Sequence, residues 1–197
     1  MNNKELEAKR QLFHMLLGIA IVALLIYGLI NKTHIFFLII IGIIISFLSK
    51  KYKIPAICWF LRNFDREKDL KSFPGKGVIF YLIGVFLTLS FFPLDIAMPA
   101  ILVLAFGDSV SHLFGIRYGK TRHFLTDKKF LEGFIAGLIA GFIGAKVFLP
   151  WHEALAASFF AMLAEGLEIK IGVEQVDDNI IIPLVAAISI SIIRILF

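Results

Sequence analysis

Long apolar segments separated by short, basic loops limit how this chain can fold more than any other feature. We count seven segments, at about 12–30, 34–49, 77–93, 96–115, 130–149, 152–168 and 180–197. A transmembrane α-helix needs about 20 predominantly apolar residues. Hydrophobic residues make up 59% of the chain and its mean hydropathy is +0.87, far from the balance of a soluble domain. The sequence therefore predicts an all-α, polytopic membrane bundle of about seven transmembrane helices.

The distribution of Lys and Arg predicts the orientation of this bundle. With a cytoplasmic N-terminus, the loops 50–76, 116–129 and 169–179 lie on the same side and hold all but three of the remaining basic residues. Basic loops remain in the cytoplasm. We expect a multi-pass protein in the cell membrane if it is prokaryotic, or in the endoplasmic reticulum if it is eukaryotic. With 197 residues and no polar linker, 1–197 is expected to form a single domain whose first apolar run is retained.

The charge and cysteine content exclude some classes of function. The net charge is +5, but the basic residues occupy short loops between apolar runs, where they set topology and attract anionic lipid or phosphate. We therefore expect no nucleic-acid partner. The single cysteine, Cys58, can form neither an internal disulfide nor a CxxC metal site.

The loop 50–76 contains a pattern typical of an interfacial helix. Apolar residues recur at helical spacing with basic residues opposite, at Ile54, Ile57, Cys58, Leu61 and Phe64. We expect an amphipathic helix on the membrane surface, whose default role is anchoring. Guiding a lipid headgroup is the alternative.

Asp108 is the acid whose position most needs an explanation. It lies inside an apolar segment, and His112 and Gly115 follow at i+4 and i+7 on the same helical stripe. Gly107 permits a break or a close backbone approach. Ionisable groups in a membrane helix usually face a polar cavity, a partner or a ligand. A structural pair with His112 or a basic residue remains an alternative, although such buried pairs contribute little stability.

A basic loop follows this segment, with Arg117, Lys120, Arg122, His123, Lys128 and Lys129. Its string from Gly115 to Thr121 has three residues between the glycines where a Walker A loop has four, and it follows a membrane helix, so we reject a P-loop. The cluster indicates a cationic site for a polyphosphate. Topological charge is the alternative.

Acidic residues gather near the same end of the predicted bundle. They are Glu132, Glu165, Glu168, Asp177 and Asp178, followed by Asn179. An Asp or Asn N-cap of the last helix explains only one of them. Glu132 could also pair with a lysine one helical turn earlier. Together these oxygen ligands beside a basic loop would suit a divalent cation and a nucleotide.

Glycines repeat every fourth residue in the fifth apolar segment, at Gly133, Gly137 and Gly141. Small residues at this spacing form close helix–helix contacts in membranes. We expect this helix to pack against the one that carries Asp108.

Several strings together resemble the CTP-dependent polyprenol and dolichol kinase family, which includes dolichol kinase, phytol kinase and the yeast-type diacylglycerol kinase. They are Arg10-x-x-x-His14-x-x-x-Gly18, Gly107-Asp108-Ser109 with Gly115 and Gly119-Lys120, Lys128-Lys129-x-x-Glu132-Gly133, Glu165, and Asp178-Asn179-x-x-x-Pro183-Leu184. They occur in the family's order over nearly the whole chain. The family often has Arg-Lys where this chain has Arg10-Gln11.

The resemblance implies a kinase that transfers the γ-phosphoryl group of CTP to a membrane lipid alcohol, a dolichol, polyprenol or related isoprenoid, with Mg²⁺ or another divalent cation. The expected catalytic residues are Asp108 and Glu132, with Asp108 as metal ligand or base. The expected nucleotide ligands are Arg10, Ser109, Lys120, Arg122, Lys128 and Lys129. The expected metal ligands are Asp108, Glu165, Asp178 and Asn179. Gly107, Gly115, Gly119, Gly133 and Gly137 are expected at close-packing positions. The site would face the cytoplasm.

Two other functions remain open at this stage. A CTP-dependent cytidylyltransferase acting on a lipid phosphate would use the same loop and cation but would release pyrophosphate. A small transporter would use buried carboxylates and glycine-broken helices. The sequence contains no evident inverted repeat, and its acids cluster near one membrane face, which favours an enzyme. The sequence indicates no oligomeric state.

Overall fold

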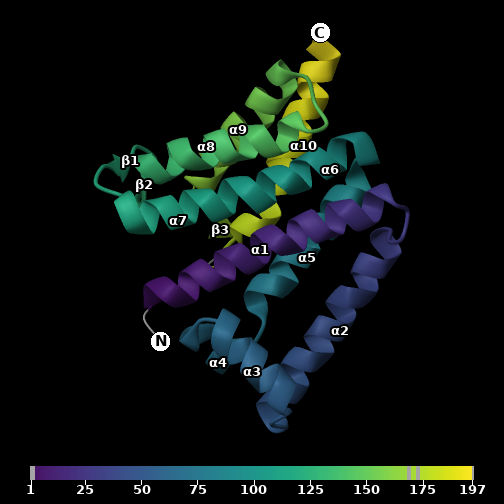
Figure 1. Cartoon of the computed structure of the whole chain (residues 1–197), viewed down its shortest axis with the longest axis vertical. Helices are drawn as coiled ribbons and strands as arrows, with labels where there is room; N and C mark the ends of the chain where they lie inside the picture. Colours follow the sequence, from purple (N-terminus) through teal and green to yellow (C-terminus); the bar gives the residue numbers. More distant parts are fainter. Residues whose placement is uncertain (1–2, 168–169, 172–173, 197) are drawn as a thin grey trace.

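A computed structural model of the chain describes residues 3–167, 170–171 and 174–196. The helices are α1 (Asn3–Ile26), α2 (Lys32–Lys51), α3 (Pro55–Phe64), α4 (Glu67–Ser72), α5 (Lys76–Phe91), α6 (Leu94–Leu102), the π-helix η1 (Val103–Asp108), α7 (Ser109–Tyr118), α8 (Leu131–Lys146), α9 (Trp151–Glu165) and α10 (Asp178–Leu196). The short strands are β1 (Arg122–His123), β2 (Thr126–Phe130), β3 (Lys170–Ile171) and β4 (Glu174–Gln175). Figure 1 shows these elements as one helical bundle.

Each of the seven apolar segments forms a helix or a continuous helical stretch, which confirms a helical membrane protein. Four are long and apolar enough to cross a membrane, namely Lys4–Ile26, Lys32–Lys51, Leu94–Tyr118 and Asp178–Leu196. Helices α5, α8 and α9 have 16, 16 and 15 residues and are shorter than a full span. The count of seven spans therefore stays a prediction.

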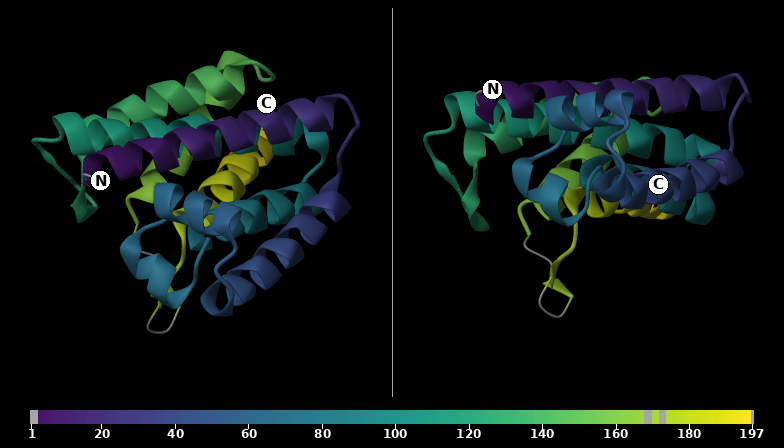
Figure 2. Two further views of the ribbon diagram at one scale, coloured as in Figure 1. Left: turned by 60° about the horizontal axis from the view of Figure 1, so that its bottom comes forward. Right: turned by 90° about the horizontal axis from the view of Figure 1, so that it is seen from below.

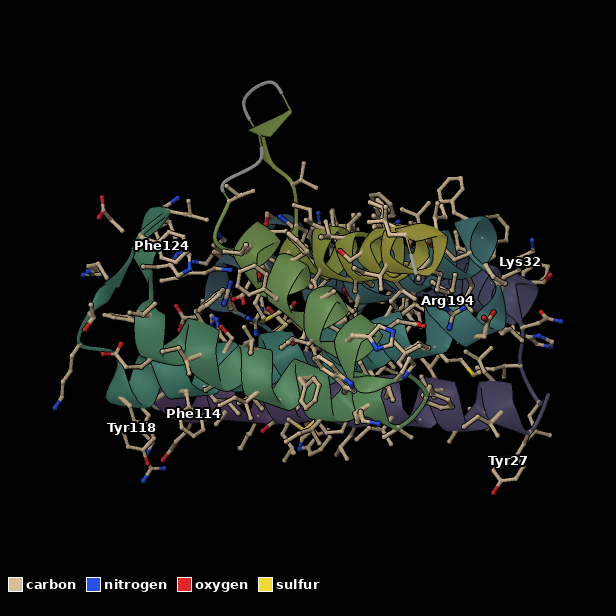
Figure 3. All side chains as sticks on the ribbon, turned by 90° about the horizontal axis from the view of Figure 1, so that it is seen from above. Tyr27, Lys32, Phe114, Tyr118, Phe124 and Arg194 are labelled. Carbon is tan, nitrogen blue, oxygen red and sulfur yellow. The ribbon has the colours of Figure 1, made fainter. Side chains whose placement is uncertain are left out.

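The connecting segments separate to two ends of the bundle. The N-terminus, the hairpin β1–β2 and helices α3 and α4 lie toward one end, and the α1–α2 turn and the C-terminus lie toward the other (Figure 1, Figure 2). Figure 3 shows Phe114, Tyr118 and Phe124 at the hairpin end and Tyr27, Lys32 and Arg194 at the opposite end. Which end faces the cytoplasm stays a prediction.

Helix α10 lies within the bundle and packs against α9, α5, α6 and η1. Small buried side chains at the α9 contact, including Ala157, Ala161, Ala186 and Ala187, allow close packing of the two helices. Helix α2 packs mainly against α5 and exposes most of its apolar side chains. Its exposed face is suited to lipid.

The helical stretch that carries Asp108 is not a regular α-helix. Helix α6 contains Pro99, and the next turn widens into the π-helix η1, which ends at Asp108. π-turns within α-helices are rare and frequently lie at functional sites. The sequence predicted a break or a close approach at Gly107, and both are present: a Cβ there would lie 2.9 Å from Cε of Met162.

Glycines of α8 face the helix that carries Asp108, as the spacing predicts. A Cβ added at Gly133 would lie 2.6 Å from the backbone oxygen of Ser111, and one at Gly137 would lie 2.8 Å from the backbone oxygen of Gly107. Only residues without a side chain fit these positions. Gly119 is similarly confined by the ring of Phe130, while Gly115 has ordinary space around it.

The segment between α2 and α5 forms the predicted amphipathic helix and one further turn. Helix α3 buries Leu61 and leaves Trp59 exposed, and rings of Phe60 and Phe64 contact Phe13 of α1. The carboxylate of Asp65 accepts a hydrogen bond of 2.7 Å from the backbone N–H of Gly75, whose φ is 77°. These contacts hold α4 and the start of α5 beside α1.

Two antiparallel ladders add short strands to an otherwise helical fold. Strand β1 pairs with β2, and Lys170 and Ile171 of β3 pair with Gln175 and Glu174 of β4. The sequence did not predict them, because strands of two residues have no measurable periodicity.

Arg194, one of the few basic residues outside the basic loops, is held by two acids at the end of the bundle opposite the hairpin. Its Nε lies 2.8 Å from Glu153 of α9, and its Nη1 contacts Asp95 of α6. A charge near a helix end is thus neutralised where three helices meet.

The glycine contact between α7 and α8 gives a matched test of packing. We expect Gly133→Ala to lower the free energy of unfolding by about 1–3 kcal/mol, because its Cβ meets backbone that cannot move aside. Gly115→Ala adds the same methyl group 3.8 Å from Phe130 and is expected to be neutral or mildly stabilising. Thermal unfolding in detergent measures both. Equal melting temperatures for the two variants would contradict this packing.

Candidate active site

A polar cavity of about 490 Å³ opens between α1, α4, the starts of α5 and α10, and the η1–α7 junction. Its size is in the range of small-molecule sites. The residues that line it are Arg10, Gln11, Arg66, Lys68, Asp69, Lys76, Gly77, Asp108, His112, Lys129, Val176, Asp177, Asp178 and Asn179. Five are permanently cationic and four are acidic, so the cavity holds both charges in separate parts of its wall.

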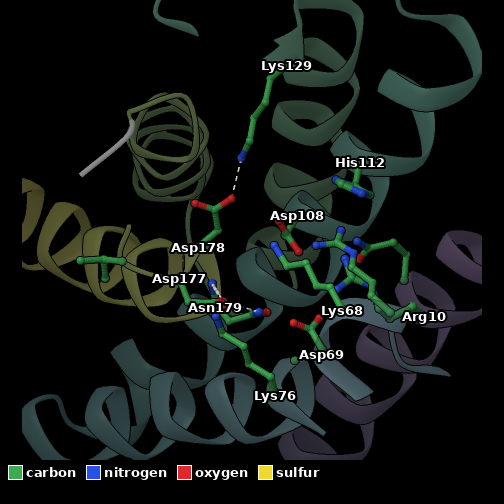
Figure 4. Close-up of a pocket in the computed structure, with 14 residues that line it drawn as sticks. Arg10, Lys68, Asp69, Lys76, Asp108, His112, Lys129, Asp177, Asp178 and Asn179 are labelled. Carbon is green, nitrogen blue, oxygen red and sulfur yellow. Dashed lines mark hydrogen bonds and ion pairs between the residues drawn. The ribbon is translucent and has the colours of Figure 1, made fainter. Parts of the chain in front are cut away.

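Asp108 lies at the centre of this arrangement. Its carboxylate is buried at the end of η1, and Figure 4 shows it between Asp178 on one side and Arg10 on the other. It enters none of the ion pairs formed within the described chain. The alternative in which it pairs with His112 lacks its contact, because Nε2 of His112 lies 3.2 Å from Glu7 instead. The carboxylate is therefore available to a ligand.

Lys129 of β2 bridges two acids from different helices. Its Nζ lies 2.9 Å from Oε1 of Glu165 and 2.7 Å from Oδ2 of Asp178 (Figure 4 marks the second contact). Ser111 also donates to Oε1 of Glu165, at 3.1 Å. Burial alone would lower the pKa of Lys129, but Glu165, Asp178 and Asp108 outweigh it and raise this pKa above its usual value. The ammonium group stays charged at neutral pH.

Asp178 and Asn179 open α10 on the floor of the cavity. Oδ1 of Asp177 accepts hydrogen bonds from N and Nδ2 of Asn179, at 3.2 and 2.7 Å, which fixes the start of the helix. Gly84 of α5 lets this start approach closely, since a Cβ there would overlap the backbone oxygen of Asn179. Oδ1 of Asp178 and Oδ1 of Asn179 are buried without a hydrogen-bond partner among the described residues. Such orphaned oxygens usually signal an absent ion or water.

The opposite wall is cationic. Arg10 comes from α1, Arg66 and Lys68 from the α3–α4 junction and α4, and Lys76 from the first residue of α5. Burial alone would lower the pKa of Arg66, but the adjacent Glu7 carboxylate raises it. Planar guanidinium groups and lysine ammonium groups are the usual ligands of phosphate oxygens.

The structure brings together some of the predicted site residues and leaves others outside. Arg10, Asp108, Lys129, Asp178 and Asn179 line the cavity. Glu165 lies directly behind Lys129. The remaining predicted residues, Ser109, Lys120, Arg122, Lys128 and Glu132, do not line it.

Each residue outside the cavity has a defined environment. Ser109 is fully buried and its Oγ has no partner among the described residues. Lys120, Arg122 and Lys128 are exposed on or beside the hairpin, and Arg122 stacks 4.8 Å from the centroid of the Phe130 ring. Glu132 accepts backbone N–H groups of Lys120 and Thr121 at 3.1–3.3 Å. The predicted acid Glu168 lies outside the described residues.

A divalent cation has oxygen ligands available here. Within the described ranges, no group of three or more His, Cys, Asp or Glu residues is close enough to hold a metal by itself. Mg²⁺, however, is commonly held by one or two carboxylates, substrate phosphates and water. Asp108, Asp178 and the amide oxygen of Asn179 fit that requirement, and two of these groups carry the orphaned oxygens described above.

Three known proteins are similar to this chain over nearly its whole length. An uncharacterized protein of Methanocaldococcus jannaschii is 30% identical over 187 residues, covering 94% of this chain and 93% of its own. The CTP-dependent diacylglycerol kinase 1 of Schizosaccharomyces pombe is 28% identical, covering 94% and 92%. That of Eremothecium gossypii is 24% identical, covering 92% and 65%. The chain belongs to the family of CTP-dependent lipid kinases.

No family model matches the chain, and no solved structure matches it significantly. Membership of the lipid kinase family therefore rests on these relatives, and it agrees with the resemblance of the sequence strings. The same strings converge in space: Arg10, Asp108, Lys129, Asp178 and Asn179 all reach one cavity.

Sequence reasoning missed several cavity residues of this lipid kinase family member. Arg66, Lys68 and Lys76 were counted only as topological charge, because basic residues in a loop look alike before folding. Glu7 and Gln11 were not singled out, although Glu7 lies one turn before Arg10 on the same helix face. That spacing was the available signal.

The Lys129 bridge gives a test of the site's electrostatics. We expect Lys129→Met to lower the free energy of unfolding by about 3–5 kcal/mol, because it leaves the buried carboxylate of Glu165 without its partner. Lys128→Met, at the exposed neighbouring residue, is expected to change it by less than about 1 kcal/mol. Adding Glu165→Gln to Lys129→Met should restore part of the loss. Thermal unfolding of the four proteins measures this, and equal stability of the two single variants would refute the bridge.

Proposed function

We propose that this protein is a CTP-dependent kinase that transfers the γ-phosphoryl group of CTP to the hydroxyl group of a membrane lipid alcohol. One observation carries the proposal: the unpaired carboxylate of Asp108 faces a cavity with cations on one wall and oxygen ligands on the other. Phosphoryl transfer requires mainly alignment of the reactants and neutralisation of charge, and such a cavity supplies both.

In the proposed reaction Asp108 accepts the proton of the lipid hydroxyl. The hydroxyl oxygen forms a bond with the γ-phosphorus while the bond from that phosphorus to the β,γ-bridging oxygen breaks. CDP leaves with the bond's electron pair, and the lipid monophosphate remains. Asp108 thus orients the attacking oxygen and takes up its proton at the moment of transfer.

The triphosphate would lie against the cationic wall of Arg10, Arg66, Lys68 and Lys76. Lys129 would contact it from the other side while remaining next to Asp178. Lys120, Arg122, Lys128 and Ser109, the nucleotide ligands expected from the sequence, form the alternative set, and Glu132 would act by holding the hairpin. The two sets are distinguishable by substitution.

We propose that Asp108, Asp178 and Asn179 hold Mg²⁺ or another divalent cation, with Glu165 positioning the group through Lys129. Such a cation neutralises charge on the β- and γ-phosphates. Lys129 would then balance the remaining negative charge of the acids.

The lipid acceptor and the membrane side complete the proposal. The isoprenoid alcohol expected from the sequence is the acceptor to test first, and diacylglycerol, named for the fungal relatives, is its competitor. We place the cavity on the cytoplasmic side, because it lies at the end of the bundle with the N-terminus, α4 and the hairpin, where most Lys and Arg residues are. Cytosolic CTP and membrane lipid would meet there.

Purified protein incubated with γ-labelled CTP tests the reaction. We expect label in the lipid fraction with dolichol, polyprenol or phytol, and diacylglycerol serves as the competing acceptor. Label in pyrophosphate would indicate cytidylyl transfer instead. Absence of both products with every acceptor would contradict the proposal.

Asp108→Asn tests the proposed base. We expect kcat to fall by about 10²–10⁴-fold, because the amide cannot take up the proton, while insertion and melting temperature change little. Asp127→Asn, at an exposed acid of the hairpin, is the matched control and should keep full activity. Wild-type turnover of the Asp108 variant would remove this residue from the mechanism.

Paired lysine variants decide which cations hold the triphosphate. We expect Lys68→Gln combined with Lys76→Gln to raise KM for CTP by about tenfold or more, since each removes a charge from the cavity wall. Lys120→Gln combined with Lys128→Gln removes the same charge from the hairpin and is expected to change KM less than about threefold. The reverse order would support the hairpin set expected from the sequence.

A further inference from the structure

We infer that Glu7 is a positioning residue that holds Arg10 and Arg66 ready for the β- and γ-phosphates of the nucleotide. This inference rests on the proposed function. Glu7 itself does not line the cavity, but Arg10, Arg66 and His112, which surround its carboxylate, all do.

The contacts of Glu7 join three separate parts of the chain. Arg66, between α3 and α4, donates from Nε to Oε1 at 2.6 Å and from Nη2 to Oε2 at 3.2 Å. Arg10, one turn later on α1, approaches Oε2 with Nε at 3.2 Å and Nη2 at 3.0 Å. Nε2 of His112 on α7 lies 3.2 Å from the same oxygen. One carboxylate thus fixes two guanidinium groups and one imidazole.

The remaining donors of the two arginines match a polyphosphate. A guanidinium group has five N–H donors, and Glu7 occupies only two of them on each arginine. Three donors of each arginine therefore remain for phosphate oxygens, which guanidinium groups bind in pairs. One carboxylate between two guanidinium groups leaves net positive charge on this wall, so Glu7 orders the arginines without neutralising them.

The burial of the cluster separates this role from that of an ordinary surface ion pair. The side chains of Glu7 and Arg10 are only 15% and 13% exposed, and Arg66 is 38% exposed. Exposed ion pairs lose much of their effect to solvent and side-chain entropy. Fixing two long side chains before the ligand arrives removes part of the ordering cost of binding. We therefore expect loss of Glu7 to weaken the contacts with the terminal phosphates specifically.

The test compares CTP with CMP, which lacks the β- and γ-phosphates. Full-length Glu7→Gln protein is purified in detergent, and its Kd values for CTP and CMP are measured by calorimetry, together with KM for CTP and kcat. We expect Kd and KM for CTP to rise about tenfold, while Kd for CMP changes less than about twofold and kcat is retained. Glu5→Gln, an exposed acid two residues earlier on α1, is the matched control and should leave all four values unchanged.

A second variant covers the case in which Glu7→Gln does not fold. Arg66→Lys keeps the positive charge but loses the two-point contact with Glu7. We expect it to weaken CTP binding selectively too. In the double variant the two losses should be less than additive, because both remove the same ordered arginine.

The outcomes distinguish this inference from the proposed function. Equal weakening of CTP and CMP binding, or wild-type affinity for CTP in both variants, would overturn the positioning role while leaving the kinase intact. If wild-type protein bound no CTP at all, the proposed function would fail first and this inference would fail with it.

Discussion

The ion pairs between Lys129 and the two acids Glu165 and Asp178 are the interaction on which the site depends. They join the hairpin, the end of α9 and the start of α10 at one point. An unpaired carboxylate at this depth in an apolar bundle would be costly, and an unpaired ammonium group equally so. The bridge therefore fixes where α10 begins, and with it the orphaned oxygens of Asp178 and Asn179 that face the cavity.

Close helix contacts place Asp108 opposite these oxygens. Gly133 and Gly137 bring α8 against the helix that carries Asp108, and Gly84 brings the start of α10 against α5. The π-helix before Asp108 adds a wide turn at this point. The polar end of the bundle is thus built by helices that pack through glycine, which leaves space for a cavity without opening the apolar core.

Much of the helical fold and the centre of the site could be predicted from the sequence, and most of the cationic wall could not. Apolar run length identified every helical segment, and the isolation of Asp108 in such a run marked it as functional. The lysines of the hairpin and those of α4 and α5 are indistinguishable as loop charges, yet only Lys68, Lys76 and Lys129 reach the cavity. That difference depends on how α3 and α4 fold back onto α1, through aromatic contacts such as Phe13 with Phe60.

The central claim is that one cavity holds the triphosphate beside Asp108. A structure of the protein with a non-hydrolysable CTP analogue and Mg²⁺ tests it most directly. Our account predicts the γ-phosphate between Asp108 and the wall of Arg10, Lys68 and Lys76, with the metal density beside Asp178 and Asn179. A triphosphate bound along Lys120, Arg122 and Lys128, with this cavity empty, would contradict it.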